Sequence, residues 1–138
     1  MRSAVHPLAP RWTGTWNAEP DAVSAIRHAL LRYADTAGAS ERTRDAVGLA
    51  VSEAATNAVV HAYVDHDEPG SIVITSWLID AHRLRVVVAD DGRGMQPRTD
   101  SPGMGLGLPL MAQVAQKLVI ESAPQQGTEV TMDFQLLT

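Results

Sequence analysis

The chain has 138 residues, 45% of them hydrophobic and 20% charged, which are ordinary values for one soluble globular domain with a real core. Cysteine is absent, which excludes a disulfide framework and a thiolate metal site, and no apolar run is long enough to span a membrane. The net charge is −5, and no Lys/Arg cluster or secretory leader is present. We therefore expect a cytoplasmic protein that binds neither nucleic acid nor membrane directly.

The N-terminal region combines a segment without periodicity and a short strand. Residues 1–10 contain two prolines and predict a loose start, followed by a single domain over residues 11–138. Residues 11–16 are typical of an edge strand that carries Trp12 and Trp16 on one side. We expect both tryptophans to pack on the core, and the alternative is a strand offered to a partner.

Two helices are predicted next. Pro20 lies in the first turn of the first helix, and apolar residues recur at helical spacing until about Ala37, after which Gly38 ends it. Ser40 is positioned to cap the second helix. We expect residues 51–62 to belong to this second helix and to form one long helical stretch.

The second helix carries polar groups where a core helix normally has none. Glu53 and Asn57 are four residues apart and therefore share a face, and His61 extends this stripe by another turn. A carboxylate and a carboxamide in apolar surroundings are costly without partners, so we expect a bound group to supply them. The surrounding girdle is nearly all apolar: Val47, Ala50, Val51, Ala54, Ala55, Ala58 and Val59.

A polar link and a β-hairpin follow this helix. Residues 61–70 contain several His and Asp side chains, which predict a solvated loop, and a metal site is the alternative. Alternating β-branched residues predict strands at 71–79 and 83–90, antiparallel because a short turn joins them. The alternation places Asp90 on the core-facing side just as the second strand ends.

The remainder of the chain predicts a loop, a helix and two strands. Residues 91–103 have no apolar spacing, and residues 103–107 lead into a helix that continues to Ala115. Strands at 118–122 and 128–136 close the chain. This order of elements favours an α+β two-layer sandwich, with a mixed, mostly antiparallel sheet and helices on one face.

Glycine-rich loops before a helix suggest phosphate binding, because backbone amides approach an anion closely there. Neither loop satisfies G-x-G-x-x-G, since Pro97 and Leu108 stand where the third glycine belongs. The pattern G-x-x-x-x-G-K-[ST] is absent as well. The sequence therefore supports neither a dinucleotide-binding fold nor a P-loop.

Four motifs are more specific when they are taken together. They are Glu53-x3-Asn57 on a helix, Asp90-x-Gly92-x-Gly94 ending a strand, Gly103-x-Gly105-x-Gly107 opening a helix, and Gly127-Thr128 opening the last strand. With these motifs the chain resembles the GHKL ATPases, which include gyrase, heat-shock chaperone ATPases, histidine kinases and MutL repair proteins.

Within that superfamily the chain looks most like the bacterial anti-sigma factor serine kinases. Residues 52–63 are very close to the helix motif of those kinases. Two further segments are close to the corresponding family motifs: Gly103-Met104-Gly105, and residues 119–122 followed by Gly127-Thr128. The resemblance spans about residues 16–134, and it implies the Bergerat ATP-binding fold with ATP and Mg²⁺ as cofactors.

The resemblance also implies a role for individual side chains. Asn57 takes the place of the asparagine that binds Mg²⁺ bridging the ATP phosphates, and Glu53 that of the general base, or of the group that orients the attacking hydroxyl or water. Asp90 takes the place of the aspartate that accepts a hydrogen bond from the adenine amino group. Thr128 matches the threonine that supports the adenine site, although a plain β-forming residue is the alternative. His61 matches the motif without a defined role, except that it suits a helix C-terminus.

Further cofactor-binding positions follow from the same resemblance. Gly94 lets the backbone approach the base, the glycines of the second loop wrap the phosphates, and residues 95–102 form a lid over ATP. The implied positions are Gly92, Gly94, Gly103, Met104, Gly105, Leu106 and Gly107.

Two departures from the family pattern concern phosphoryl transfer. The lid is short, and Ser101-Pro102 occupy the place where the family usually has an arginine. Arg93 and Arg98 are the available substitutes for a charge-stabilising arginine. A complete histidine kinase is not expected, because 138 residues leave no room for a phosphoacceptor hairpin domain.

The resemblance implies an ATP-dependent serine kinase and anti-sigma factor that phosphorylates a STAS-type anti-anti-sigma partner and sequesters a sigma factor. One alternative is an ATP-binding regulatory module that holds its partner without phosphoryl transfer, and another is an interaction protein with a degenerate site. Family members usually form homodimers through the first strand and helix, for which Trp12, Trp16 and the Val23/Ile26 face are the candidates.

Overall fold

The computed structural model describes residues 10–63, 66–68, 70–94 and 108–138. The predicted loose start lies outside the described residues, apart from Pro10. The elements are β1 (Trp12–Asn17), α1 (Ala22–Thr36), α2 (Glu41–Asn57), η1 (Ala58–Ala62), β2 (Ser71–Leu78), β3 (Arg83–Asp90), α3 (Leu108–Val114), β4 (Lys117–Ala123) and β5 (Gly127–Gln135). Apart from η1, their types and order are those that the sequence predicts, and most ends differ by one or two residues.

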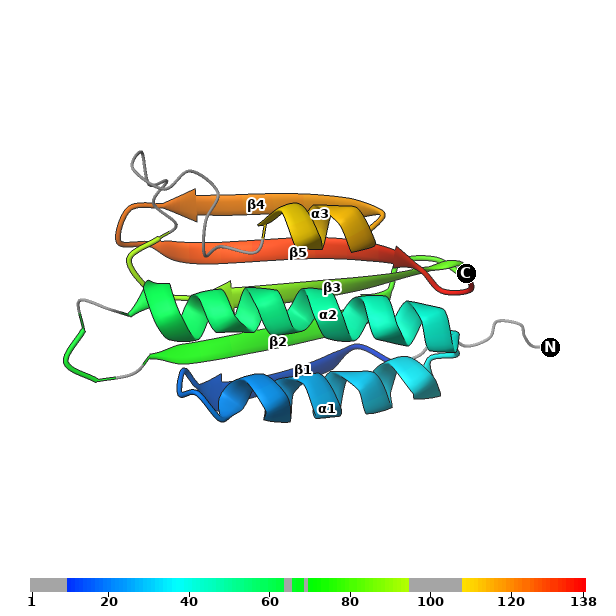
Figure 1. Cartoon of the computed structure of the whole chain (residues 1–138), viewed down its shortest axis with the longest axis horizontal. Helices are drawn as coiled ribbons and strands as arrows, with labels where there is room; N and C mark the ends of the chain where they lie inside the picture. Colours follow the sequence, from blue (N-terminus) through cyan, green and yellow to red (C-terminus); the bar gives the residue numbers. More distant parts are fainter. Residues whose placement is uncertain (1–9, 64–65, 69, 95–107) are drawn as a thin grey trace.

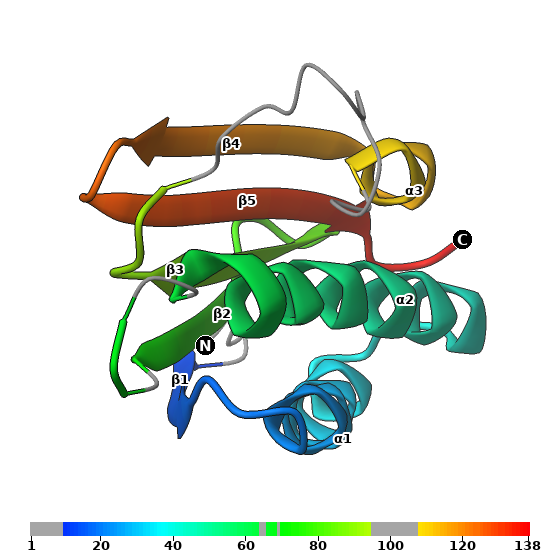
Figure 2. The same cartoon turned by 60° about the vertical axis from the view of Figure 1, so that its left-hand side comes forward.

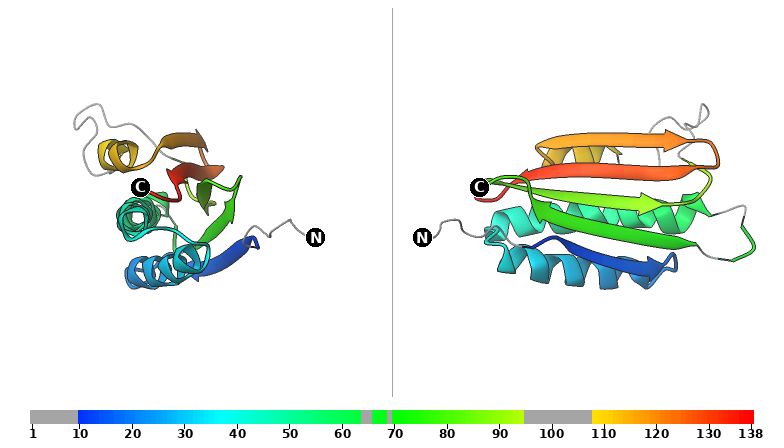
Figure 3. Two further views of the ribbon diagram at one scale, coloured as in Figure 1. Left: turned by 90° about the vertical axis from the view of Figure 1, so that its right-hand side faces the viewer. Right: turned by 180° about the vertical axis from the view of Figure 1, so that it is seen from behind.

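The strands form one sheet with the order β1-β2-β3-β5-β4, and all three helices cover the same face of it (Figure 3). The expected two-layer α+β architecture is confirmed. All pairings between the described strands are antiparallel, so the sheet is not mixed as the sequence analysis allowed. The core lies between the layers, where Ile72, Ile74, Val86 and Met132 meet the apolar sides of α1 and α2.

Strand β1 lies at one edge of the sheet, as predicted, and its tryptophans pack inward. The Trp12 ring stacks on Tyr33 of α1 with 5.9 Å between centroids, and Trp16 lies 6.1 Å from Trp12. This arrangement agrees with the prediction that both rings pack on the core. Ile26, which was a candidate for a dimer interface, is fully buried within the chain and has no surface to offer a partner.

Helix α2 begins as predicted and ends differently. The Ser40 hydroxyl accepts a hydrogen bond from the Thr43 backbone N–H at 3.2 Å, which is an N-cap. The α-helix stops at Asn57, however, and continues as one π-type turn, η1. The expectation of one uniform helix to residue 62 is therefore wrong. The α-helical spacing that placed His61 on the polar stripe does not extend past Asn57, because π-turns contain more residues.

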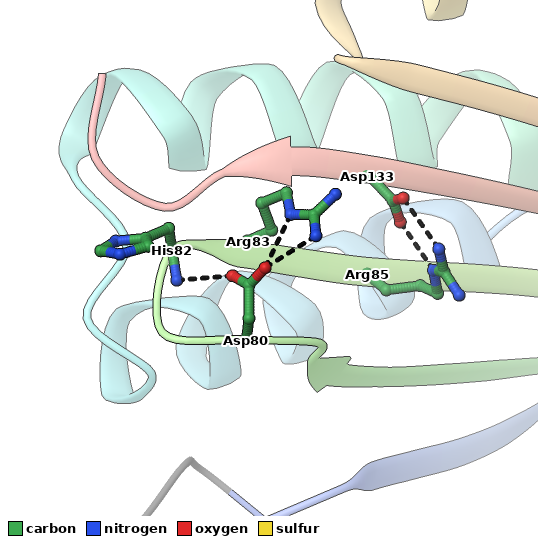
Figure 4. Close-up of polar contacts among 5 residues, drawn as sticks. All are labelled: Asp80, His82, Arg83, Arg85 and Asp133. Carbon is green, nitrogen blue, oxygen red and sulfur yellow. Dashed lines mark hydrogen bonds and ion pairs between the residues drawn. The ribbon is translucent and has the colours of Figure 1, made fainter.

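The outer face of the sheet carries an ion pair that the sequence analysis did not anticipate. Arg85 on β3 and Asp133 on β5 are register partners, and the guanidinium donates to both carboxylate oxygens at 2.7 and 2.9 Å (Figure 4). Asp133 is only 2% exposed, whereas Arg85 is 30% exposed at its side chain. The expected strand at 128–136 gave no sign of a buried carboxylate on the outer face of the sheet.

Asp133→Asn should destabilise the fold by about 2–3 kcal/mol, measured by chemical denaturation, because it leaves the Arg85 charge without its partner. The expected loss is smaller than for a fully buried pair, since Arg85 keeps some contact with water. Asp80→Asn is the matched control (Figure 4), because Asp80 and Arg83 form a 2.7 Å pair with both side chains exposed. The control should leave stability almost unchanged. Equal losses of unfolding free energy in the two variants would contradict the stabilising role assigned to the Arg85–Asp133 pair.

Candidate functional site

The motif residues that the structure describes gather at one end of the molecule. Figures 1 and 2 show that the end of α2, the end of β3 and the start of β5 lie at the same end. Two backbone contacts join them: the Arg93 N–H donates to the Ala62 carbonyl at 2.7 Å, and Asp90 pairs with Thr128 in the sheet register. Segments far apart in the sequence are therefore held next to one another at this end.

Asn57 and Glu53 lie in the last turns of α2. Asn57 is 9% exposed and stands at the junction between the α-helix and η1, while Glu53 is half-buried one turn earlier. Their immediate neighbours along the helix, Ala54, Ala55 and Ala58, are buried. Both polar side chains are thus set in an apolar helix face, as the sequence predicted. A π-turn next to such a residue is a feature frequently found at functional sites.

Asp90 ends β3 with its carboxylate turned to the core side and half-buried. Burial raises the pKa of Asp90 above its ordinary value of 3.8, and hydrogen bonds from the backbone N–H groups of Gly92 and Thr128 partly offset that rise. The Gly92 N–H donates to Asp90 Oδ1 at 2.9 Å. A carboxylate has about four acceptor sites, so Asp90 keeps capacity to accept from an amino group of a ligand.

The two glycines after Asp90 are required by contacts within the protein. A Cβ atom on Gly92 would collide with the Ala62 carbonyl oxygen, and one on Gly94 would lie 2.5 Å from the Ala123 carbonyl oxygen. Gly94 also adopts a φ of 86°, which favours glycine. The close approach that the structure describes is to protein backbone, and approach to a base stays a prediction.

Thr128 is buried at the start of β5, and its hydroxyl lies 3.0 Å from the Ser122 hydroxyl on β4. Both residues, together with Asp90, line a cavity of about 410 Å³ at this end of the sheet. Glu53 and Asn57 are not among its described lining residues. The polar side chains that line this cavity thus come from three different strands.

Several predictions fall on other parts of the chain. The lid at residues 95–102, Arg98, and the second glycine box with Gly103, Met104, Gly105, Leu106 and Gly107 lie outside the described residues. In the polar link, His66 and Asp67 are exposed, as expected for a solvated loop. No group of three or more His, Cys, Asp or Glu side chains able to hold a metal ion occurs within the described parts of the chain.

The described residues fit a nucleotide with one bound Mg²⁺. Asn57 offers a neutral oxygen, which suits a hard cation that keeps most of its waters and takes its other ligands from phosphate oxygens. Asp90 is a half-buried acceptor fixed by backbone N–H groups, which suits recognition of an exocyclic amino group.

Among the described helices, none is long and apolar enough to cross a membrane.

The substitution Asp90→Asn should affect the stability of the folded chain and its affinity for ATP differently. The native chain holds the Asp90 proton more tightly than the unfolded chain, whose carboxyl titrates near 3.8. This contribution to stability is present at lower pH and is lost as the pH rises through the raised pKa of Asp90 in the native chain. Asparagine at this position does not titrate, so the unfolding free energy of the variant should decline less than that of wild type above about pH 4. At neutral pH the ligand-free variant should be at least as stable as wild type, yet bind ATP about tenfold or more weakly by calorimetry.

Tyr63 is a structural link in this site that the sequence motifs did not identify. Tyr63 is part of the helix motif that carried the family resemblance, but its hydroxyl contacts only became apparent in the structure. The hydroxyl donates to the Ser71 carbonyl at 2.6 Å and accepts from the Asp91 N–H at 2.8 Å. The available signal was a tyrosine directly after the polar helix, where one polar atom ends an otherwise apolar side chain.

Comparison with known protein families matches residues 16–134 to the histidine kinase-like ATPase domain. A blue-light-activated histidine kinase 2 of Erythrobacter litoralis is 37% identical over 75% of this chain and 31% of its own length. An anti-sigma F factor of Caldanaerobacter subterraneus is 35% identical over 60% of this chain and 64% of its own. A serine-protein kinase RsbW of Bacillus pumilus is 39% identical over 54% of this chain and 46% of its own length.

These matches cover less than two thirds of each of the three relatives. Among solved structures, the RsbU and RsbW domains of a Mycobacterium tuberculosis protein superpose with a TM-score of 0.73 at 24% identity. That likeness covers 92% of this chain and 32% of the other. This likeness shows a common fold. Similarity in sequence is shown by the comparison with the three relatives described above.

Proposed function

The chain belongs to the histidine kinase-like ATPases, in the family of the anti-sigma factor serine kinases, and from this we propose that it is an ATP-dependent protein serine kinase that acts as an anti-sigma factor. In this proposal it phosphorylates a STAS-type anti-anti-sigma partner and sequesters a sigma factor in the cytoplasm. The main supporting observation is that α2, which carries the buried Asn57, continues into a turn whose end is hydrogen-bonded to the segment directly after the half-buried, backbone-anchored Asp90.

Each described site residue has a chemical task in this proposal. Asp90 accepts a hydrogen bond from the adenine amino group, and Thr128 supports it from β5. Asn57 holds Mg²⁺, which would neutralise charge on the phosphates when bound. Glu53 accepts the proton of the attacking serine hydroxyl as the oxygen–phosphorus bond forms and the bond from the γ-phosphorus to the bridging oxygen breaks, leaving ADP.

The partners and assembly belong to the same proposal. A sigma factor is the partner to which the name anti-sigma F factor points, and a STAS-domain protein is the partner that the family resemblance implies. A homodimer through β1 and α1 would use the exposed edge of β1 and the partly buried Val23, since Ile26 is enclosed.

A two-part experiment tests the proposal. The purified chain is first incubated with Mg-ATP and passed over a desalting column, and retained nucleotide is measured. It is then mixed with γ-labelled ATP and a purified STAS-domain protein, and label on a serine of that protein is followed. Retention with transfer supports the kinase, and failure to retain ATP would contradict the whole proposal.

The second candidate is an ATP-binding regulatory module that binds its partner without phosphoryl transfer. The short stretch between the two glycine boxes and Ser101-Pro102 in place of an arginine favour it. It predicts nucleotide retention without label on the STAS-domain protein, so the second part of the experiment separates the two candidates.

A further inference from the structure

Tyr63 connects three segments that the proposed nucleotide site needs in fixed relative positions. It follows the end of η1, and it is 8% exposed. Its hydroxyl donates to the carbonyl of Ser71, the first residue of β2, at 2.6 Å. The same oxygen accepts from the backbone N–H of Asp91, directly after β3, at 2.8 Å. One oxygen atom thus completes a chain of hydrogen bonds across the helix end and both strands of the hairpin.

A second contact holds the same two elements together. The Ala62 carbonyl, at the end of η1, accepts from the Arg93 N–H at 2.7 Å, and Gly92 leaves no room for a side chain between them. Asp90 lies between the strand and this doubly attached turn. The Tyr63 hydroxyl and the Ala62–Arg93 bond thus both help to fix the position of the Asp90 carboxylate relative to the helix end.

We propose that Tyr63 is a positioning residue for base recognition: its hydroxyl holds the turn after β3 so that the Asp90 carboxylate faces the adenine amino group. This inference rests on the proposed ATP site and adds a specificity determinant to it. The residue acts through Asp90 and the backbone, and it does not itself contact the nucleotide.

The physical basis is the cost of leaving two backbone groups unsatisfied. Without the hydroxyl, the Asp91 N–H and one acceptor site of the Ser71 carbonyl lose their partner in a buried position. The turn gains freedom to move toward water, and Asp90 moves with it. Because burial raises the pKa of Tyr63, the hydroxyl stays protonated and remains a donor at neutral pH. Recognition of an amino group should therefore weaken more than general binding of the triphosphate.

The test compares ATP with inosine triphosphate, which carries a carbonyl oxygen where adenine has its amino group and cannot donate to Asp90. Affinities of both nucleotides with Mg²⁺ are measured by calorimetry for wild type, Tyr63→Phe and Tyr33→Phe. Tyr33 is a matched control, because it is 9% exposed and its hydroxyl makes one comparable bond, to the Pro10 carbonyl at 2.8 Å. Both variants keep the ring and lose one buried hydroxyl.

Tyr63→Phe should reduce the ATP-to-inosine triphosphate affinity ratio about fivefold or more, whereas Tyr33→Phe should leave the wild-type ratio unchanged. An unchanged ratio in Tyr63→Phe, with wild type still discriminating, would overturn the inference and leave the proposed function intact. Absence of ATP binding by wild type would instead overturn the proposed function.

A measurement on the wild-type chain covers the case in which Tyr63→Phe does not fold. The Asp91 amide proton should be protected from hydrogen exchange, and its protection should rise when Mg-ATP is added. Exchange of this proton at the rate of a free amide, or protection that ATP leaves unchanged, would overturn the inference without any substitution.

Discussion

Asn57→Ala is expected to weaken Mg-ATP binding about 100-fold or more in isothermal titration, while the chain stays folded. The side chain is 9% exposed and is the residue to which we assign the metal. Removing a metal ligand costs more than removing a group that only orients one, for which a 10- to 100-fold loss is typical. Alanine is a strong helix former, so the end of α2 should persist and the loss should appear in binding.

Thr56→Ala is the matched control for this prediction. Thr56 is the neighbouring residue on α2, and its side chain is exposed. Its removal should change neither Mg-ATP affinity nor its dependence on Mg²⁺. Normal Mg-ATP binding by Asn57→Ala would show that the site has been placed on the wrong helix face, and it would remove the basis for the role assigned to Glu53 as well.

The fold was predictable because local signals agree with one another along most of the chain. Ser40 caps α2, Gly38 adopts a left-handed φ of 97° just after α1, and alternation in β3 gives the correct inward face. Short connections also made the antiparallel pairing of β2 with β3 and of β4 with β5 predictable. These signals act over a few residues, which is why the sequence alone carries them.

Features that depend on contacts between distant residues were not predictable. The π-turn after Asn57 ends at Ala62, whose carbonyl accepts from the Arg93 N–H 31 residues further along the chain. The Arg85–Asp133 pair joins positions 48 apart in the sequence. Helical and β periodicities contain no information about either. The role of Tyr63 belongs to the same class, because its two hydroxyl partners lie at the start of β2 and in the turn after β3.

The candidate site itself was predictable only in part. The residue types at Glu53, Asn57 and Asp90 follow from the motifs, and the inward direction of Asp90 follows from strand alternation. The raised pKa of Asp90 does not follow, because it is caused by burial in the fold and is partly offset by hydrogen bonds from the Gly92 and Thr128 N–H groups. Sequence motifs identify the groups at the site, whereas the fold determines their protonation and their relative positions.

Glu53→Gln is expected to retain Mg-ATP affinity within about twofold and to reduce phosphoryl transfer to a STAS-domain serine by about 10²- to 10⁴-fold, the usual range for a general base. Glutamine keeps the shape and helix propensity of glutamate but cannot accept the serine proton. The measurement is the initial rate of label incorporation from γ-labelled ATP at saturating nucleotide. A rate effect without an affinity effect is the pattern expected of a group that acts only in the transition state.

Glu41→Gln provides the control, because it removes an exposed carboxylate from the first turn of the same helix and should leave the transfer rate unchanged. Equal incorporation by Glu53→Gln and wild type would refute the catalytic assignment. Glu53 is half-buried one turn before Asn57, so the proton acceptor and the metal ligand are carried by one rigid helix. Their separation is then independent of the segment between the glycine boxes, and the Glu53 variant measures the chemistry of transfer apart from nucleotide retention.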